Sequence, residues 1–183
     1  MTSTLDVAPS PAFTLPPHVV DDSAAIAAWF TDPPGVVLQF MRPTRGTTEL
    51  ARWVVGPGYN QLVRRFPDCH ELRVVLDMRQ MTGRAATARA VMIDHAKLVS
   101  QRLGRVIVLP SVHMGAFYLT VVETTALMLR AFGVRIEIEQ SLERALAKQE
   151  IRVAAPFEAP RATVAARTGS GTGRASGTGR ALL

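Results

Sequence analysis

The hydrophobic residues of the chain fall into short apolar runs separated by turn-forming residues. Runs with strand character occupy residues 25–30, 36–41, 72–77, 105–109 and 134–138. Segments with apolar residues at helical spacing occupy 47–66, 84–103, 114–132 and 142–149. The order is two strands, followed by helices and strands in alternation. This pattern predicts an α/β domain with a mainly parallel sheet of about five strands, right-handed crossovers and flanking helices.

The first two strands are expected to form an antiparallel hairpin. Only Asp32-Pro33-Pro34-Gly35 separates them, and a connection this short is too short for a parallel crossover. Residues 105–109 are nearly all aliphatic, which is typical of a parallel strand buried on both faces. Residues 134–138 alternate apolar and polar, so we expect this strand near a sheet edge or with one wet face.

Several residues predict where the helices begin, bend and end. The Gly56-Pro57-Gly58 sequence must kink or split the helix over 47–66. Gly104 and Gly133 stand where glycine C-caps of the preceding helices belong. Ser141 is the expected N-cap of the last helix.

The two ends of the chain differ from the domain between them, residues 24–151. Residues 1–23 are rich in Pro, Ser and Thr and are expected to form a flexible arm. Residues 152–183 are dominated by Ala, Gly, Thr, Ser and Arg, and Ser-Gly-Thr-Gly-Arg-Ala occurs twice within 170–181. This composition buries too little apolar area to offset its ordering entropy. We therefore expect a disordered basic tail, acting either as a plain linker or as a docking peptide ending in Ala181-Leu182-Leu183.

Composition and charge narrow the function classes. With 183 residues, 48% of them hydrophobic, the chain is long enough for one domain with a core. The net charge is +6, and residues 151–183 hold five arginines against one glutamate, so the body of the protein is close to neutral. Widely spaced arginines predict only weak, salt-sensitive attraction to nucleic acid, so no specific nucleic-acid partner is expected.

The remaining composition argues against other classes of site. Cys69 is the only cysteine, which excludes an internal disulfide and a multi-cysteine metal site. Asp94 and His95 are neighbours on a helix and point about 100° apart, so they cannot chelate one ion together. No metal and no cofactor is expected. The sequence shows no secretory signal and no transmembrane segment, and a cytoplasmic location is the expectation.

The order of elements over residues 25–149 resembles the STAS fold, the family of the anti-sigma-factor antagonists and the C-terminal domains of sulfate transporters. The most telling piece is Val74-Val75-Leu76-Asp77 with its short loop into the helix over 84–103. The family's phosphoacceptor serine lies in an Asp-Ser-Ser-Gly-Leu stretch, which falls here on Ala85-Ala86-Thr87-Ala88-Arg89, with Thr87 as the one hydroxyl. The chain therefore looks more like the degenerate STAS-like or SEC14-like domains.

The loop that leads from the strand over 72–77 into the next helix is the first candidate site. Ligands of open α/β sheets bind outside the carboxyl ends of the strands. The candidate binding residues are Asp77, Thr82, Gly83, Arg84 and Thr87. The Thr82 hydroxyl is expected to cap the helix, and free N–H groups together with Arg84 could hold an anion or a phosphorylated residue. The alternative is that these residues have only a local structural role.

The helix over 114–132 is the second candidate site. Between Val106 and Leu129 only Glu123 is ionised, so the apolar sector is unusually wide. We expect one stripe of this helix to face the sheet, made of Phe117, Val121, Thr125, Met128 and Phe132. The neighbouring stripe is the candidate interface, made of Tyr118, Val122, Ala126 and Leu129. Its cover would be the N-terminal arm or, as the favoured reading, another chain.

These observations favour a non-enzymatic regulatory domain that binds a protein partner, including a second copy of itself. No catalytic residue is assigned. One alternative is a carrier of a lipid or small apolar ligand, as the SEC14-like resemblance implies, which requires a cavity under helix 114–132. A second is a hydrolase using Ser111 and His113, although the Gly-x-Ser-x-Gly elbow is absent. A third is a structural assembly subunit that uses its tails.

Overall fold

The computed structural model describes residues 13–22, 25–111, 113 and 115–153. The strands of the described chain are β1 (Val19–Asp21), β2 (Ile26–Asp32), β3 (Gly35–Phe40), β4 (Thr44–Gly46), β5 (Leu72–Asp77), β6 (Met81–Arg84), β7 (Leu103–Leu109), β8 (Arg135–Ile138) and β9 (Arg152–Val153). The helices are α1 (Thr48–Trp53), the π-turn η1 (Val54–Gly58), α2 (Tyr59–Arg65), α3 (Ala86–Val99), the 3-10 turn η2 (Ser100–Arg102), α4 (Gly115–Arg130) and α5 (Leu142–Lys148).

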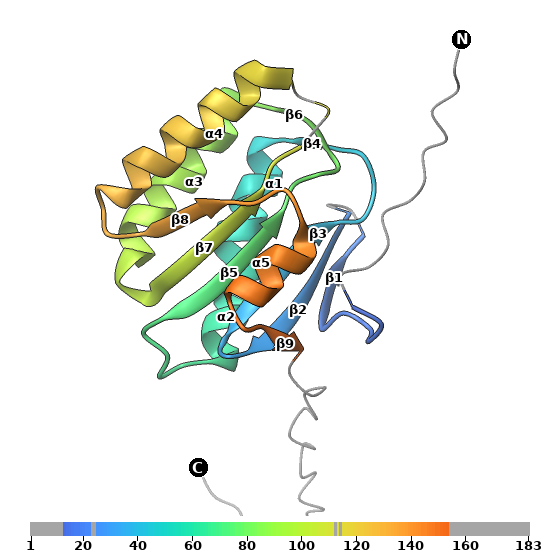
Figure 1. Cartoon of the computed structure of the whole chain (residues 1–183), viewed down its shortest axis with the longest axis vertical. Helices are drawn as coiled ribbons and strands as arrows, with labels where there is room; N and C mark the ends of the chain where they lie inside the picture. Colours follow the sequence, from blue (N-terminus) through green and yellow to red (C-terminus); the bar gives the residue numbers. More distant parts are fainter. Residues whose placement is uncertain (1–12, 23–24, 112, 114, 154–183) are drawn as a thin grey trace, which may run out of the picture.

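The central sheet has the predicted mixed topology (Figure 1). Its order is β1-β2-β3-β5-β7-β8, with β9 added beside β2. Strands β2 and β3 form the antiparallel hairpin, in register from Ile26↔Phe40 to Thr31↔Gly35, and β3, β5, β7 and β8 run parallel. Strand β7 lies inside the sheet between β5 and β8, and β8 lies at the edge, as its sequence pattern indicated. The α/β fold expected from the sequence is confirmed, and β1, β9 and the small β4–β6 sheet extend it.

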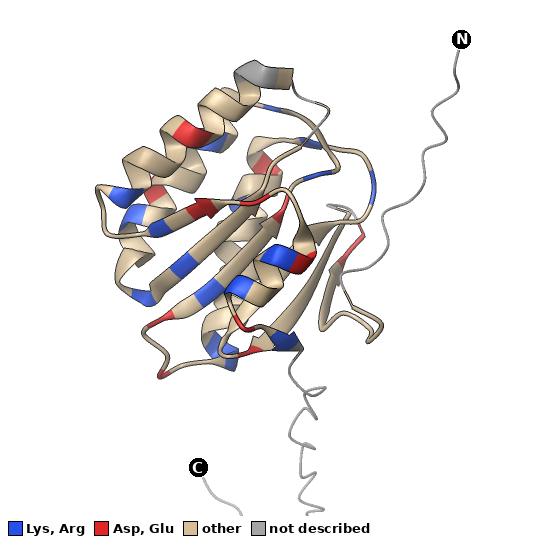
Figure 2. Cartoon of the chain, in the orientation of Figure 1, with Lys and Arg blue, Asp and Glu red and all other residues tan. Residues whose placement is uncertain are grey.

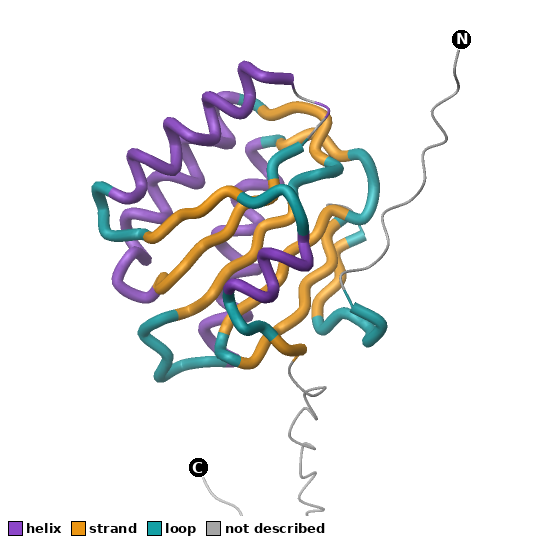
Figure 3. The backbone as a smooth tube through the Cα atoms, in the orientation of Figure 1, coloured by secondary structure: helices purple, strands orange, loops and turns teal. Residues whose placement is uncertain are grey.

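Two layers of different make-up cover the sheet (Figure 3). Helices α1 to α4 lie on one face, while α5 and the segment around Phe13 lie on the other. Because side chains alternate along a strand, β5 sends Leu72, Val74 and Leu76 toward α1–α4 and Val75 toward α5. The sheet therefore separates the core cluster beneath α5 from the two clusters on the α1–α4 face.

The predicted helix boundaries are partly confirmed. Gly56-Pro57-Gly58 splits the helix predicted over 47–66 through the π-helical η1, and Ser141 caps α5 by accepting a hydrogen bond from the Arg144 N–H. Gly133 has the left-handed φ of +85° expected after a helix. Gly104 is a correction, because it lies inside β7 rather than at a helix end. A Cβ there would lie 3.0 Å from the Cβ of Glu71, so glycine permits a close approach between the chain entering β5 and β7.

The predicted arm over residues 1–23 is wrong where the structure describes it. Strand β1 pairs with β2, the Trp29 Nε1–H donates to the Leu15 carbonyl at 2.9 Å, and the Phe13 ring packs edge-on against Trp29. An indole N–H buried in the sheet needs such an acceptor. The predicted tail also begins too early, since β9 pairs with β2. The rest of both predictions, residues 1–12 and 154–183, lies outside the described residues.

Helix α4 presents the opposite stripe from the one expected. The candidate interface residues Tyr118, Val122, Ala126 and Leu129 are all buried against the sheet. The stripe assigned to the sheet is exposed at its C-terminal end, where Met128 is 42% and Phe132 45% exposed, while Val121 and Thr125 are partly buried. The side chain of Phe117 lies outside the described residues. Both stripes are apolar, so the sequence pattern did not distinguish them. No helix in the described part of the chain is both long and apolar enough to cross a membrane.

Candidate functional site

The carboxylate of Asp77, at the carboxyl end of β5, is occupied by hydrogen bonds within the protein. Its carboxylate is 2% exposed and accepts hydrogen bonds from Gln39 Nε2 at 3.1 Å and from the Arg79 guanidinium at 2.9 and 2.8 Å. The Arg79 backbone N–H also donates to it at 3.2 Å. The hydrogen bond to Asp77 raises the pKa of Arg79 above its ordinary value. Asp77 therefore fixes the loop after β5 and has little capacity left for a ligand.

The other predicted residues of this edge do not form one site. Thr82 is exposed in β6, and the N-cap of α3 is Ala85, which has no side-chain cap, so the predicted capping role of Thr82 is wrong. The chain over 81–84 pairs with β4 instead of starting the helix, and Gly83 lies opposite Arg45. The Thr87 hydroxyl lies 2.6 Å from that of Thr48 and links α3 to α1.

Arg84 is the member of this set that points into the molecule. Its guanidinium lies 5.7 Å from the centre of the Tyr118 ring, and its Cγ packs 3.2 Å from the position that a Cβ of Gly46 would take. Burial lowers the pKa of Arg84, while burial raises the pKa of Tyr118. Arg84 makes no ion pair with a carboxylate among the residues that the structure describes.

An apolar cavity of about 200 Å³ lies between the sheet and helices α1–α4, and Arg84 is part of its wall. The sheet contributes Val74, Leu76 and Val106 to its floor. These residues belong to the two central strands, yet each is only partly buried. The floor extends from Val74 to Met78 along β5, roughly 13 Å at the rise of a strand. The cavity is thus an elongated apolar space with very few polar groups.

His95 of α3 is the second titratable group of note in the cavity wall. Its Nε2 is buried and has no hydrogen-bond partner among the described residues, and its ring packs edge-on against Tyr59 at 4.7 Å. Burial lowers the pKa of His95, because the charged imidazolium loses its hydration. Burial likewise raises the pKa of Tyr59.

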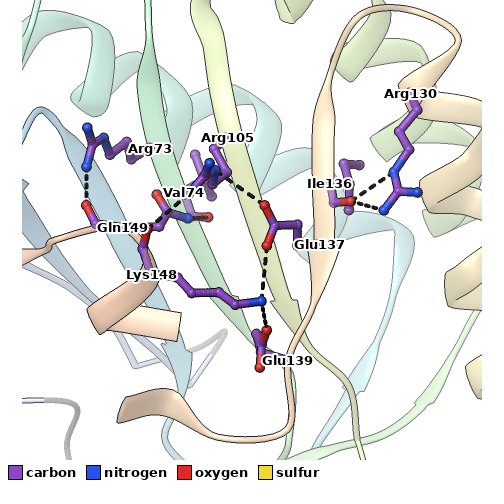
Figure 4. A network of polar contacts seen from close by, with 9 residues as sticks. All are labelled: Arg73, Val74, Arg105, Arg130, Ile136, Glu137, Glu139, Lys148 and Gln149. Carbon is purple, nitrogen blue, oxygen red and sulfur yellow. Dashed lines mark hydrogen bonds and ion pairs between the residues drawn. The ribbon is translucent and has the colours of Figure 1, made fainter. Parts of the chain in front are cut away.

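The opposite face of the sheet carries a polar groove instead of an apolar one (Figure 4). Arg73, Arg105 and Arg135 lie side by side on β5, β7 and β8 and line it; Figure 2 shows basic segments on these strands at one end of the sheet. Arg73 donates to the Gln149 carbonyl, and Arg105 donates to the Lys148 carbonyl at 3.0 Å. Two of the three arginines therefore cap the C-terminal end of α5.

Acidic residues balance much of this groove. Glu137 lies 3.4 Å from Arg105 Nε and 3.3 Å from Lys148 Nζ, and Glu139 also pairs with Lys148. The hydrogen bonds that Lys148 donates to Glu139 and Glu137 raise the pKa of Lys148. The charged residues of the groove therefore form a network that holds α5 onto the sheet. Most of their charges are already paired within this network.

The hydrolase alternative finds no catalytic arrangement. Ser111 is 2% exposed, and its hydroxyl donates to the Met81 carbonyl while accepting from the His113 backbone N–H at 3.2 Å. The His113 contact is thus made by its backbone and not by its ring. Asp77, the nearby acid, is bound to Arg79. A general base aimed at the serine, which this chemistry requires, is not among these contacts.

The sequence indicates Arg84 as a binding residue and leaves a cavity beneath residues 114–132 as an alternative, but it does not predict that His95 lines that cavity. Strand periodicity assigns Val74, Leu76 and Val106 to a core face, but it cannot say whether helices fill the space above them. The one available signal was the inward position of a histidine and an arginine among apolar neighbours. His95 was weighed only beside Asp94, as a metal ligand.

Comparison with known proteins adds one structural likeness. The chain is similar to an uncharacterized protein of the DUF3478 family from Shewanella loihica, which is described as having a SpoIIAA-like fold. The identity is 10% and the TM-score 0.49, and the match covers 68% of this chain and 91% of the other. No protein-family model matches the chain, and the search of curated proteins finds no match. The function proposed below is argued from this chain's own geometry.

Proposed function

We propose that this protein is a non-enzymatic binding domain that holds a small apolar molecule or an acyl chain in the cavity between the sheet and α1–α4. The observation that carries the proposal is the partly exposed floor of the cavity, Val74, Leu76 and Val106, in the two central strands of the sheet. It corresponds to the carrier alternative of the sequence analysis, which required a cavity beneath the helix over residues 114–132.

The energetic cost of an empty cavity supports this proposal. At roughly 24 cal/mol per Å³, an unfilled space of about 200 Å³ costs up to about 5 kcal/mol. The free energy of unfolding of a small domain is only about 5–15 kcal/mol, so an empty cavity would cost a large fraction of it. An apolar cavity does not fill with ordered water, because water there lacks polar partners. An apolar ligand would recover this lost packing.

Uptake of an uncharged fluorescent apolar probe, N-phenylnaphthylamine, by the full chain tests the proposal. We expect enhanced probe fluorescence with wild-type protein and a clear loss of it in Val106→Phe, whose ring would occupy the cavity floor. The matched control is Leu98→Phe, which adds a similar side chain at a position that is 83% exposed. A folded wild-type protein that takes up no probe would overturn the proposal, as would equal uptake by the two variants.

A second candidate function is self-association through the outer ridge of α3 and α4. The ridge consists of Leu98, Leu127, Met128 and Phe132, which are between 42% and 83% exposed. Lys97 Nζ lies 5.1 Å above the Phe132 ring, so the end of α4 lies beside α3 here. Large exposed apolar side chains such as these four are a feature of surfaces that bind other protein chains.

Sedimentation velocity over a range of concentrations tests this second candidate. We expect a concentration-dependent dimer for the wild type and a monomer for the double variant Leu98→Ser, Leu127→Ser. Replacing two exposed leucines should not disturb the core, and circular dichroism checks that it does not. A wild type that stays monomeric throughout would exclude self-association by this ridge.

A further inference from the structure

The cavity of the proposed function has a positive charge at one end and no negative charge to balance it. Arg84 lines the cavity at the carboxyl end of the parallel strands, next to Met78 and Tyr118. The remaining walls are apolar apart from His95, Tyr59 and Thr125. A guanidinium stays charged even when partly buried, so an unpaired one in an apolar wall is costly.

The local structure directs Arg84 inward. Strand β6 pairs with β4, which sets Arg84 opposite Gly46, and the missing side chain of Gly46 leaves room for the stem of Arg84. The Ala85 N–H donates to the Gly46 carbonyl at 2.8 Å and fixes the chain on the other side of Arg84. The guanidinium then lies over the Tyr118 ring, where the face of the ring gives it only partial compensation.

Arg89, in the first turns of α3, adds a second unbalanced charge. It lies close enough to lower the pKa of Arg84, after the larger effect of burial. Among the described residues its Nε is buried without a hydrogen-bond partner, and its Nη2 lies 3.9 Å from the sulfur of Met128, outside the cavity lining. Neither arginine pairs with a carboxylate among the described residues.

We propose, as a step that rests on the proposed function, that the cavity binds an anionic amphiphile of the fatty-acid class, with its carboxylate on Arg84 and its acyl chain along the floor of β5 and β7. A carboxylate matches the guanidinium fork of Arg84 and accepts two parallel hydrogen bonds from it. The acyl chain then lies against Leu76 and Val106, which are short of packing partners. One ligand thus supplies both the missing counter-charge and the missing apolar contacts.

Displacement of bound N-phenylnaphthylamine tests this inference with two ligands of equal chain length. Dodecanoate carries the carboxylate and dodecanol does not. We expect dodecanoate to displace the probe at a concentration at least about tenfold lower than dodecanol does, because it gains charge-assisted hydrogen bonds. This comparison needs only the wild-type chain, so it does not depend on how well any variant folds.

Arg84→Met removes the charge but keeps an apolar side chain of similar length. It should abolish the preference for dodecanoate and leave the binding of dodecanol unchanged or tighter, and Arg89→Met should reduce the preference by a smaller factor. Arg144→Met, on the exposed side of α5, is the matched control and should keep it.

The possible results distinguish a failure of the anionic head group from a failure of the proposed function itself. Equal binding of dodecanoate and dodecanol, or a preference that survives Arg84→Met, would overturn the anionic head group while leaving an apolar ligand intact. Failure of the folded wild type to take up the probe or either ligand would overturn both. Dodecanoate binding that is lost in Arg144→Met and kept in Arg84→Met would place the anion at the exposed surface of α5, contrary to the proposal.

Discussion

The two faces of the sheet are built from the same strands and packed in different ways. On the α5 face, Val37, Val75, Ile107 and Leu109 are all 0% exposed, although their cover is only one seven-residue helix and the segment around Phe13. On the other face, helices α1 to α4 provide much more cover, yet Val74, Leu76 and Val106 remain partly exposed to a cavity. The face of the sheet with the larger helical cover is therefore the less completely packed of the two.

This difference shows that the cavity is not caused by a shortage of apolar residues or helices. The α1–α4 layer contains buried apolar residues such as Ile93, Tyr118 and Leu62, and it still leaves a cavity above β5 and β7. The α5 layer is held by directed polar contacts from Arg73 and Arg105 to the end of the helix. The first layer can therefore admit a ligand, whereas the second serves as a rigid support for the sheet.

The largest contrast is expected from matched leucine truncations. Leu109→Ala on the α5 face should lower the free energy of unfolding by about 3 kcal/mol or more, because the closely packed neighbours leave a new cavity. Leu76→Ala on the cavity floor should cost clearly less, about 1–2 kcal/mol, since its side chain already borders empty space. Chemical denaturation measures both. Equal losses would mean that the two faces are packed alike.

Enlarging neighbouring valines of β5 should give effects of intermediate size. Val75→Phe forces a ring into a filled region and should destabilise the protein by about 1–3 kcal/mol. Val74→Phe, one residue away but facing the cavity, should be close to neutral and should reduce probe uptake. Thermal unfolding of the two variants compares them. If Val74→Phe proved the more damaging of the two, the cavity would not be available space.

Loss of one helix-capping arginine should have a smaller effect. Arg73→Met removes the hydrogen bond to the Gln149 carbonyl and should cost about 1 kcal/mol, because a partly buried backbone acceptor loses a charged donor. Arg144→Met changes an exposed residue of the same helix and should leave stability almost unchanged. Hydrogen exchange of the α5 amides would show the difference, and unchanged protection in Arg73→Met would rule out this capping role.

The smallest effect expected is a change in the pH dependence of stability. Burial lowers the pKa of His95, so the folded state disfavours the imidazolium. As the pH falls through about 6.5, the unfolded chain takes up this proton first, and stability decreases until the folded His95 also protonates. His95→Phe should flatten this part of the profile. Denaturation at several pH values compares the two proteins, whose other titrating groups are shared, and identical slopes would contradict the assignment.

The sequence predicted the helices and strands more reliably than the contacts that these elements make with one another. The hairpin, the parallel strands and the split at Gly56-Pro57-Gly58 follow from local signals such as turn residues and periodicity, and all three are confirmed. The start of α3 was set too early, since residues 81–84 form β6. The sequence also predicted Arg84 as part of an anion site at a helix cap; the structure places the Arg84 side chain in a cavity wall instead.

By itself, then, the sequence determined that strands and helices alternate, that the hairpin comes first and that one face of each element is apolar, because these properties depend on neighbours within a few residues. Only the tertiary structure decided which of two apolar stripes of α4 meets the sheet, and whether the space above Val74 and Val106 is filled. The physical reason is that filling depends on the distance between layers, and side chains far apart in the chain set that distance together.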